Sequence, residues 1–236
     1  MRLDRRVPEP ELMEELAQAR AYDAADFAAP HQAVVDDLIR RHPELTATAR
    51  RVVDLGCGPA DVTARVAHAL PAAAVVGVDA GAVMLGLGRE RIARGGLTAR
   101  VRLVELHLPA TGDALAELGR FELVVSNSLL HHVADPSSLW ATVRALAAPG
   151  AVVHVFDLRR PADDQTVDAL VARYANEAPE VLRDDFRASL RAAYRPDEVA
   201  GQLDAAGLAD ALRVEPVGDR HLVVSGVLGA YIGNAS

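Results

Sequence analysis

The stretch VVDLGCGPADVTARVA, at residues 52–67, decides the fold of this chain. It starts with an apolar, β-branched run that is typical of a short buried strand. Gly56 and Gly58 follow, and because neither carries a Cβ, the backbone there can pass close to a ligand. The helical pattern that begins near Asp61 points its N-terminal N–H groups at the same space. We therefore predict a strand, a glycine turn and a helix, with a ligand at the turn.

Strand and helix patterns continue to alternate after this unit. The apolar runs lie at residues 51–55, 74–80, 99–106, 121–128 and 151–158, and two further runs lie at 211–217 and 220–232. Helical patterns separate the first five runs, and the pattern at 136–150 ends at Pro149 and Gly150. Strands separated by helices imply parallel crossover units with helices on both faces of the sheet. We predict an α/β fold with a doubly wound, mostly parallel sheet of seven strands.

Two segments depart from this alternation and suggest a domain organisation. Residues 1–45 show two amphipathic helical patterns, at 8–27 and 30–42, and we predict that they form a helical N-terminal cap. Residues 46–236 form the nucleotide-binding domain. Within that domain, residues 160–195 hold two additional helical patterns before the last two strands. We predict that this insertion is a lid over the substrate.

Charge and composition exclude several classes of function. The net charge is −8, and all 25 basic side chains are arginines. A chain without lysine forms no Schiff base with pyridoxal phosphate and completes no Gly-Lys-Ser/Thr phosphate loop. The acidic balance disfavours a nucleic-acid partner.

Location and redox state follow from a few positions. The most apolar stretch, at 66–88, is interrupted by His68, Pro71 and several glycines, so no membrane span is predicted. The single cysteine, Cys57, excludes an intrachain disulfide. We expect a cytoplasmic protein.

Three carboxylates near the turn indicate the kind of nucleotide. The dinucleotide pattern needs a third glycine where this chain has Asp61, and a carboxylate at that helix start would repel a pyrophosphate. Asp54 adds a second negative charge, which favours a ligand with a cationic centre. Asp79, at the end of the second run, lies where a carboxylate accepts hydrogen bonds from both ribose hydroxyls. This set favours a sulfonium nucleoside over NAD or FAD.

The same segments resemble a known family. VVDLGCGPADVTARVA and VVGVDAGAVML resemble motifs I and II of class I S-adenosylmethionine-dependent methyltransferases. FELVVSNSLLHHVADPSSLWATVRALAAPGAVVHVFDLRRP, at residues 121–161, is similar to their later motifs, and RPDEVAGQLDAAGL, at 195–208, to the helix before their final hairpin. The resemblance implies a Rossmann-like methyltransferase fold, S-adenosylmethionine as the cofactor and methyl transfer as the reaction.

The resemblance also implies a role for each matching position. The implied cofactor contacts are Asp54, Gly56, Cys57 and Gly58 around the methionine part, Asp79 at the ribose, Ala80 and Met84 beside the adenine, Glu105, Leu106 and His107 at the adenine edge, and Asn127 and Ser128 beneath the sulfonium. Two positions depart from the family pattern. Ala60 stands where the family often has a further glycine, and the third strand lacks the aspartate that the family has at its end.

Candidate catalytic residues follow the fourth and fifth strands. His131 and His132 lie at the edge where the site is expected, and a histidine pKa suits proton removal near neutral pH. We predict them as catalytic residues; the alternative is that they cap the next helix or pack under the lid. Asp157 ends the fifth run, where we expect it to pair with Arg159 or Arg160.

The histidines also raise the question of a metal ion. The candidate set would be His107, His131, His132 and Asp157, but its spacing fits no compact zinc motif. Adjacent histidines at one strand end usually point apart. We therefore predict no metal site and keep this set as a minor alternative.

Aromatic residues make up 4% of the chain and gather in the two helical segments outside the core. This clustering predicts an apolar substrate cavity, although each ring could instead fasten its segment to the core. The candidate substrate contacts are Tyr22, Phe27, His31, Asp157, Tyr174, Phe186 and Tyr194.

We predict an S-adenosylmethionine-dependent enzyme that methylates an oxygen, nitrogen or carbon of a small molecule, such as a secondary metabolite. Residues 126–129 lack the Pro-Pro-aromatic element that amino-methylating nucleic-acid enzymes share, which further disfavours nucleic acid. A homodimer is compatible with the sequence. The alternatives are an NAD(P)-dependent oxidoreductase, a non-catalytic protein that binds S-adenosylmethionine, and a methyltransferase that acts on RNA or protein.

Overall fold

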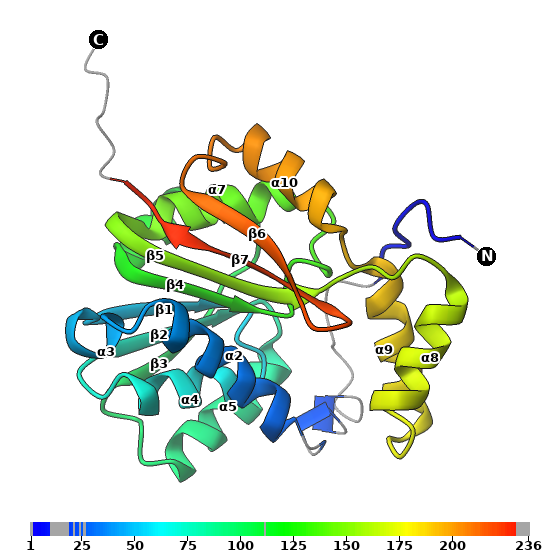
Figure 1. Ribbon diagram of the computed structural model, residues 1–236. Coiled ribbons are helices and arrows are strands. Elements are labelled where there is room, and N and C mark those ends of the chain that lie inside the picture. The colour runs from blue at the N-terminus through cyan, green and yellow to red at the C-terminus, as the bar shows by residue number, and fades with distance from the viewer. Residues whose placement is uncertain are drawn as a thin grey trace.

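The computed structural model describes residues 2–9, 19–20, 22–23, 25, 27–110 and 112–229. Within them, seven strands form one sheet in the order β3-β2-β1-β4-β5-β7-β6 (Figure 1). The strands are β1 (Arg51–Leu55), β2 (Ala74–Asp79), β3 (Val101–Glu105), β4 (Phe121–Asn127), β5 (Ala147–Leu158), β6 (Leu212–Val217) and β7 (His221–Val227). The first five strands are parallel, and β7 runs antiparallel to both β5 and β6. The α/β, doubly wound and mostly parallel fold is confirmed.

Helices cover both faces of the sheet in the described part of the chain. They are α2 (Ala28–Arg41), α3 (Leu45–Thr48), α4 (Asp61–Ala69), α5 (Ala82–Arg94), α6 (Gly112–Leu118), α7 (Pro136–Leu146), α8 (Asp164–Tyr174), α9 (Glu180–Ala192) and α10 (Pro196–Ala205). In Figure 1, α7 and α10 lie on one face, and α2, α4 and α5 lie on the other. No helix among the described residues is long and apolar enough to cross a membrane.

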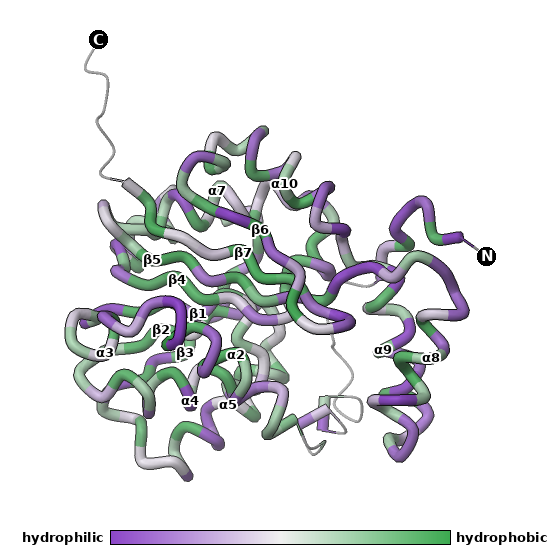
Figure 2. The backbone as a smooth tube through the Cα atoms, in the orientation of Figure 1, coloured by the Kyte–Doolittle hydropathy of each residue, from purple (hydrophilic) through white to green (hydrophobic). Residues whose placement is uncertain are grey.

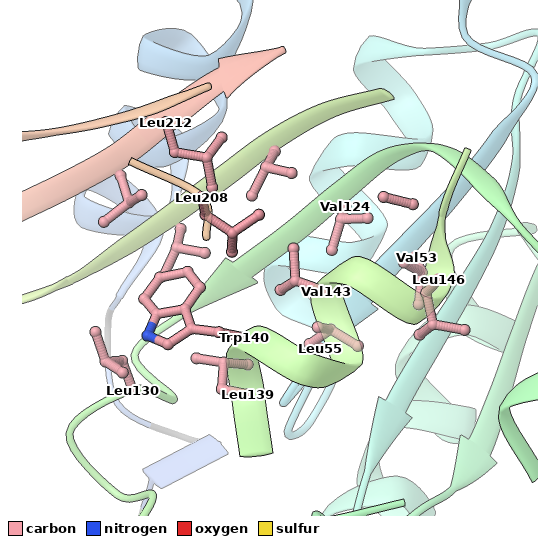
Figure 3. Packing of buried hydrophobic residues seen from close by; sticks show 14 of the residues in the cluster. Val53, Leu55, Val124, Leu130, Leu139, Trp140, Val143, Leu146, Leu208 and Leu212 are labelled. Atoms are coloured by element: carbon pink, nitrogen blue, oxygen red, sulfur yellow. The ribbon is translucent and has the colours of Figure 1, made fainter. Parts of the chain in front are cut away.

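Side chains of β4 show why both faces need cover. Val124 packs into the cluster of apolar residues on the α7 and α10 face, whereas Leu123 and Val125 pack into the cluster on the α2 and α4 face. In Figure 2, the strands at the centre of the molecule are coloured mainly as hydrophobic. On the first face, Trp140 of α7 is buried among leucine and valine side chains (Figure 3). Its Nε1 donates a hydrogen bond to Gln202 Oε1 at 3.1 Å.

The start of β5 differs from the sequence prediction. The helix expected to run to Gly150 ends at Leu146, and the strand begins at Ala147. A proline disfavours the helical conformation in the residue that precedes it, so the chain is already extended before Pro149. Gly150, with φ +80°, then allows a bend in the extended segment.

The two helices of the insertion, α8 and α9, lie beyond the carboxyl ends of the parallel strands (Figure 1). They form a small apolar cluster with Leu3 and Leu158. The N-terminal residues 2–9 form no helix, and Arg2 makes an isolated β-bridge with Asp163. Much of the predicted helix at 8–27 lies outside the described residues.

Candidate functional site

The glycine turn is fastened to the end of the neighbouring strand. Gly56 and Cys57 both donate their backbone N–H to the Val78 carbonyl, at 2.8 and 3.0 Å. Gly56 has φ +71°, and a Cβ at that position would lie 2.8 Å from the Leu129 side chain, so only glycine fits there. A Cβ on Gly58, also at positive φ, would meet no atom within 4 Å. The backbone is therefore open to a ligand at Gly58.

Asp79 links this turn to the next one. Its Oδ2 accepts the Gly58 N–H and its Oδ1 accepts the Gly81 N–H, both at 2.8 Å. Burial raises the pKa of this carboxyl, and the backbone hydrogen bonds oppose that rise. The carboxylate is held in one orientation at the carboxyl edge of the sheet, where each oxygen retains a lone pair for a hydroxyl donor.

The helix start behind the turn departs from our expectation in one respect. Asp61 lies there as predicted, but its carboxylate contacts His31 at 2.8 Å, Arg65 at 2.9 Å and Arg91 at 3.0 Å. Burial alone would raise the pKa of Asp61, yet the bonds from His31 and Arg65 lower it to about 2. Two guanidinium groups compensate this charge, so Asp61 repels a diphosphate less than the sequence suggested.

Asp54 and Ala60 lie on either side of the glycine turn, in β1 and at the start of α4. Ala60 has φ +60° and ψ +29°, the left-handed conformation that glycine adopts without strain, which explains why a glycine is common at this position. Asp54 is buried and accepts a hydrogen bond from Thr63 Oγ1 of α4 at 2.6 Å. Burial raises the pKa of Asp54 to about 7, and the Thr63 bond opposes it. The Asp54 carboxyl thus ties the strand to the helix that follows.

A buried polar cluster lies after the end of β4. His131 Nδ1 lies 2.5 Å from Asp157 Oδ1, and both side chains are nearly inaccessible to solvent. Asp157 also accepts the backbone N–H of Leu130 and of Leu158, both at 2.7 Å. Burial opposes the charge on each partner, but their mutual attraction dominates, so the pKa of His131 is raised and the pKa of Asp157 is lowered. The expected pairing of Asp157 with Arg159 or Arg160 is wrong.

Arg160 has other partners that explain this difference. Its guanidinium donates to Glu198 Oε1 at 2.5 Å and to the Ala193 carbonyl at 3.0 Å. Arg159 donates to the carbonyls of Gly218 and Asp219 in the hairpin turn. The carboxyl ends of adjacent parallel strands meet at one edge, which places Asp157 beside the histidine that follows β4 instead.

The N-terminal segment completes this cluster. Glu9 Oε1 lies 3.5 Å from His131 Nε2 and 3.3 Å from His132 Nδ1. Its other oxygen accepts a hydrogen bond from Ser189 Oγ of α9 at 3.2 Å. The rings of His131 and His132 lie 4.2 Å apart, although we expected adjacent histidines to point apart. Segments far apart in sequence therefore converge where β4 and β5 end.

Comparisons with known proteins agree with this geometry. A family model described as a methyltransferase domain matches residues 53–153. A ubiquinone biosynthesis O-methyltransferase from Methylococcus capsulatus is 30% identical over 192 residues, which span 78% of this chain and 75% of that relative. The chain belongs to the class I S-adenosylmethionine-dependent methyltransferase family.

Other known methyltransferases match different shares of this chain. A trans-aconitate 2-methyltransferase from Variovorax paradoxus is 36% identical over 107 residues, 45% of this chain and 38% of that relative. The chain spans only part of the length of some curated relatives, and one match covers 25% of the relative. A solved S-adenosylmethionine-dependent methyltransferase from Aquifex aeolicus has the same fold, with a TM-score of 0.65 at 15% identity over 92% of this chain and all of the other.

The methyltransferase brings only some of the predicted cofactor residues into close contact. Asp79, Gly56, Cys57 and Gly58 form one bonded group at the turn, with the Cys57 thiol buried and its pKa raised by that burial. Met84 is buried in α5, and the Leu106 N–H binds the Asp79 carbonyl at 2.9 Å. The other predicted positions lie at the ends of the neighbouring strands. Ala80 follows β2, Glu105 ends β3 and His107 lies two residues later, both with largely exposed side chains, and Asn127 ends β4 with Ser128 just after it.

The predicted substrate aromatics do not gather in one cavity. The ring of Phe27 contacts those of Tyr22 and His31 at tilted angles, and the three rings line a cavity of about 130 Å³ beside Pro59 and Asp61. The insertion's aromatics occupy three other places.

Tyr174 is 40% exposed, and its hydroxyl donates to Asp219 at 2.7 Å. Phe186 packs against the α8 and α9 cluster, and Tyr194 lies buried beneath the Arg6 guanidinium. The contacts of Tyr174, Phe186 and Tyr194 agree with the alternative in which these rings fasten the insertion to the core.

Sequence reasoning missed Arg6, Glu9 and Thr63. Arg6 donates to the carbonyls of His131 and Ala192 at 2.6 and 2.8 Å, so it holds the histidine loop against the end of α9. Neither Arg6 nor Glu9 belongs to a motif, because their partners lie more than a hundred residues away. Thr63 could have been found, since it faces the buried Asp54 from the first turns of α4.

Proposed function

We propose that this methyltransferase transfers a methyl group from S-adenosylmethionine to an oxygen of a small-molecule acceptor. The observation that carries the proposal is the buried Asp157–His131 pair with His132 beside it, at the same sheet edge as the glycine turn. The names of two relatives, a ubiquinone biosynthesis O-methyltransferase and a trans-aconitate 2-methyltransferase, support a small acceptor. The acidic net charge disfavours a nucleic-acid acceptor.

The residues at the turn fit the cofactor. Glycines at 56 and 58 leave the backbone bare for the methionine part, and the fixed Asp79 carboxylate can accept both ribose hydroxyls. We assign Ala80 and Met84 to the adenine face, residues 105–107 to its edge, and residues 127–128 to the region beneath the sulfur. When bound there, S-adenosylmethionine supplies an electrophilic methyl group.

The acceptor side of the site lies at the histidine pair. A hydroxyl acceptor has to lose its proton as it attacks the methyl group, and alignment in a dry site supplies much of the rate. His131 is buried between Asp157 and Glu9, whereas the side chain of His132 is 31% exposed, so His132 is the better placed to meet an acceptor. We propose that residues 160–195 exclude water from this place, because α9 reaches it through Ser189.

Two measurements test the proposal. Calorimetry should show saturable binding of S-adenosylhomocysteine and none of NADH; binding of NADH alone would support an oxidoreductase. Tritiated S-adenosylmethionine should then label a hydroxylated or carboxylated small molecule from an acceptor panel, with a product heavier by one methylene. Label that appears only in protein or RNA would refute a small acceptor, and cofactor binding without transfer to any acceptor would support a non-catalytic protein.

A further inference from the structure

Three side-chain atoms of the polar cluster are arranged like the ligands of a metal ion. Glu9 Oε1, His131 Nε2 and His132 Nδ1 all lie within 4.8 Å of one another. Two imidazoles and one carboxylate form a ligand set that zinc and related transition metals take in catalytic sites. Magnesium and calcium prefer oxygen ligands, so they fit this set less well.

The spacing of these atoms agrees with one shared cation. Zinc binds imidazole nitrogen and carboxylate oxygen at about 2.0–2.2 Å, so neighbouring ligand atoms of a tetrahedral site lie about 3.3–3.5 Å apart. Glu9 Oε1 is 3.3 Å from His132 Nδ1 and 3.5 Å from His131 Nε2. Both separations match the edge of a zinc tetrahedron.

Asp157 orients one of the two imidazoles as a metal site requires. The contact of His131 Nδ1 with Asp157 Oδ1 places the ring proton on Nδ1 when the imidazole is neutral, which leaves the Nε2 lone pair directed at Glu9. Metal-binding histidines commonly donate their other N–H to a carboxylate in this way. Asp157 is itself fixed by the N–H groups of Leu130 and Leu158.

Glu9 supplies an independent sign of an absent partner. Its side chain is only 9% exposed, and Oε1 accepts a hydrogen bond from no residue that the structure describes. A buried carboxylate without a hydrogen-bond donor on Oε1 costs free energy unless a cation lies beside that oxygen. A cation between Oε1 and the imidazoles would remove that cost.

We infer that Glu9, His131 and His132 bind one divalent transition-metal cation of the zinc class. Three protein ligands leave a fourth position of the tetrahedron open, as in catalytic zinc sites. An acceptor hydroxyl in that position would lose its proton to water more readily, because the bound cation lowers its pKa. This role for the cation rests on the proposed function, whereas the binding itself does not.

The test is direct binding to the full chain after treatment with a chelator. Zinc titration by calorimetry should show one site per chain, and Co²⁺ should give the intense visible bands of a four- or five-coordinate ion. Glu9→Gln and His132→Gln should each weaken zinc affinity at least about tenfold. His68→Gln, which removes an exposed histidine on α4, should leave the affinity unchanged.

Several outcomes would overturn the inference. They are the lack of saturable zinc binding, weak octahedral Co²⁺ bands, or equal zinc affinity of wild type and Glu9→Gln. Binding of S-adenosylhomocysteine by each variant shows whether it is folded, and the Co²⁺ spectrum of the wild type tests the site without any substitution. Stoichiometric zinc binding without methyl transfer would refute the proposed function and leave the metal site standing.

Discussion

His154 should make the stability of this protein fall as the pH falls. It lies on β5 with no exposed surface, on the face that α2 covers. Its Nδ1 is 3.4 Å from Ser225 Oγ, and its Nε2 is 3.8 Å from Asp37 Oδ2. Burial lowers the pKa of His154 to about 4; Asp37 opposes this effect, and His42 and Arg41 add to it.

The size and sign of the effect follow from this pKa. An unfolded histidine titrates near about 6.5, so between pH 4 and 6.5 the unfolded chain binds a proton that folded His154 does not. The stability that neutral His154 allows is present above pH 6.5 and is lost as the pH falls toward 4. The linkage relation gives a loss of about 2 kcal/mol in the free energy of unfolding between pH 8 and pH 5.

Urea unfolding at pH 8 and pH 5 measures this loss, with the fluorescence of the single tryptophan, Trp140, as the signal. His154→Gln removes the titration, so its free energy of unfolding should change by about 2 kcal/mol less than that of the wild type. His221, whose pKa burial also lowers to about 4, contributes to both proteins and cancels in the difference. His68→Gln should behave as the wild type does. Equal pH dependence in wild type and His154→Gln would refute the reasoning.

Three further predictions concern the turn and the core. Gly56→Ala forces a Cβ against Leu129 at positive φ and should lower the free energy of unfolding by about 2–5 kcal/mol, whereas Gly58→Ala, in open space, should cost about 1–2 kcal/mol; equal denaturation midpoints would contradict this. Asp79→Asn should weaken S-adenosylhomocysteine binding about 10- to 150-fold in calorimetry, and unchanged affinity would remove Asp79 from the ribose site. Trp140→Ala should lose about 3–5 kcal/mol in thermal or urea unfolding followed by circular dichroism, and a loss below about 1 kcal/mol would show that the pocket collapses around the gap.

The part of the fold that depends on local pattern could be predicted from the sequence. β1 spans residues 51–55 as predicted, because its apolar run and the glycines after it both act within a few residues. The start of β5 could not be placed, because it depends on pairing with β4, where Ala147 lies opposite Phe121 across a register shift. Periodicity carries no information about such a bulge.

The candidate site was predictable where it coincides with a motif. The turn at Gly56 and Gly58 and the place of Asp79 at the end of β2 follow from a strand–turn–helix pattern that the sequence shows directly, whereas the hydrogen bond from the Gly58 N–H to Asp79 was not predicted. The partner of Asp157 could not be predicted in this way. Arg159 and Arg160 are its neighbours in the sequence, but the folded chain brings His131 into contact with it instead. The role of Glu9 could not be predicted for the same reason, because the sequence of residues 2–9 does not indicate which part of the fold they contact.

The hydrogen bonds of Arg6 have a consequence for how the N-terminal segment can move. Its guanidinium donates to the carbonyls of His131, Val133 and Ala192 and to the Tyr194 hydroxyl. Peeling away the first residues of the chain would break all four bonds together, so that segment detaches as a unit or not at all. Any movement of the N-terminal segment is therefore coupled, through this one side chain, to the loop that carries His131 and to the end of α9.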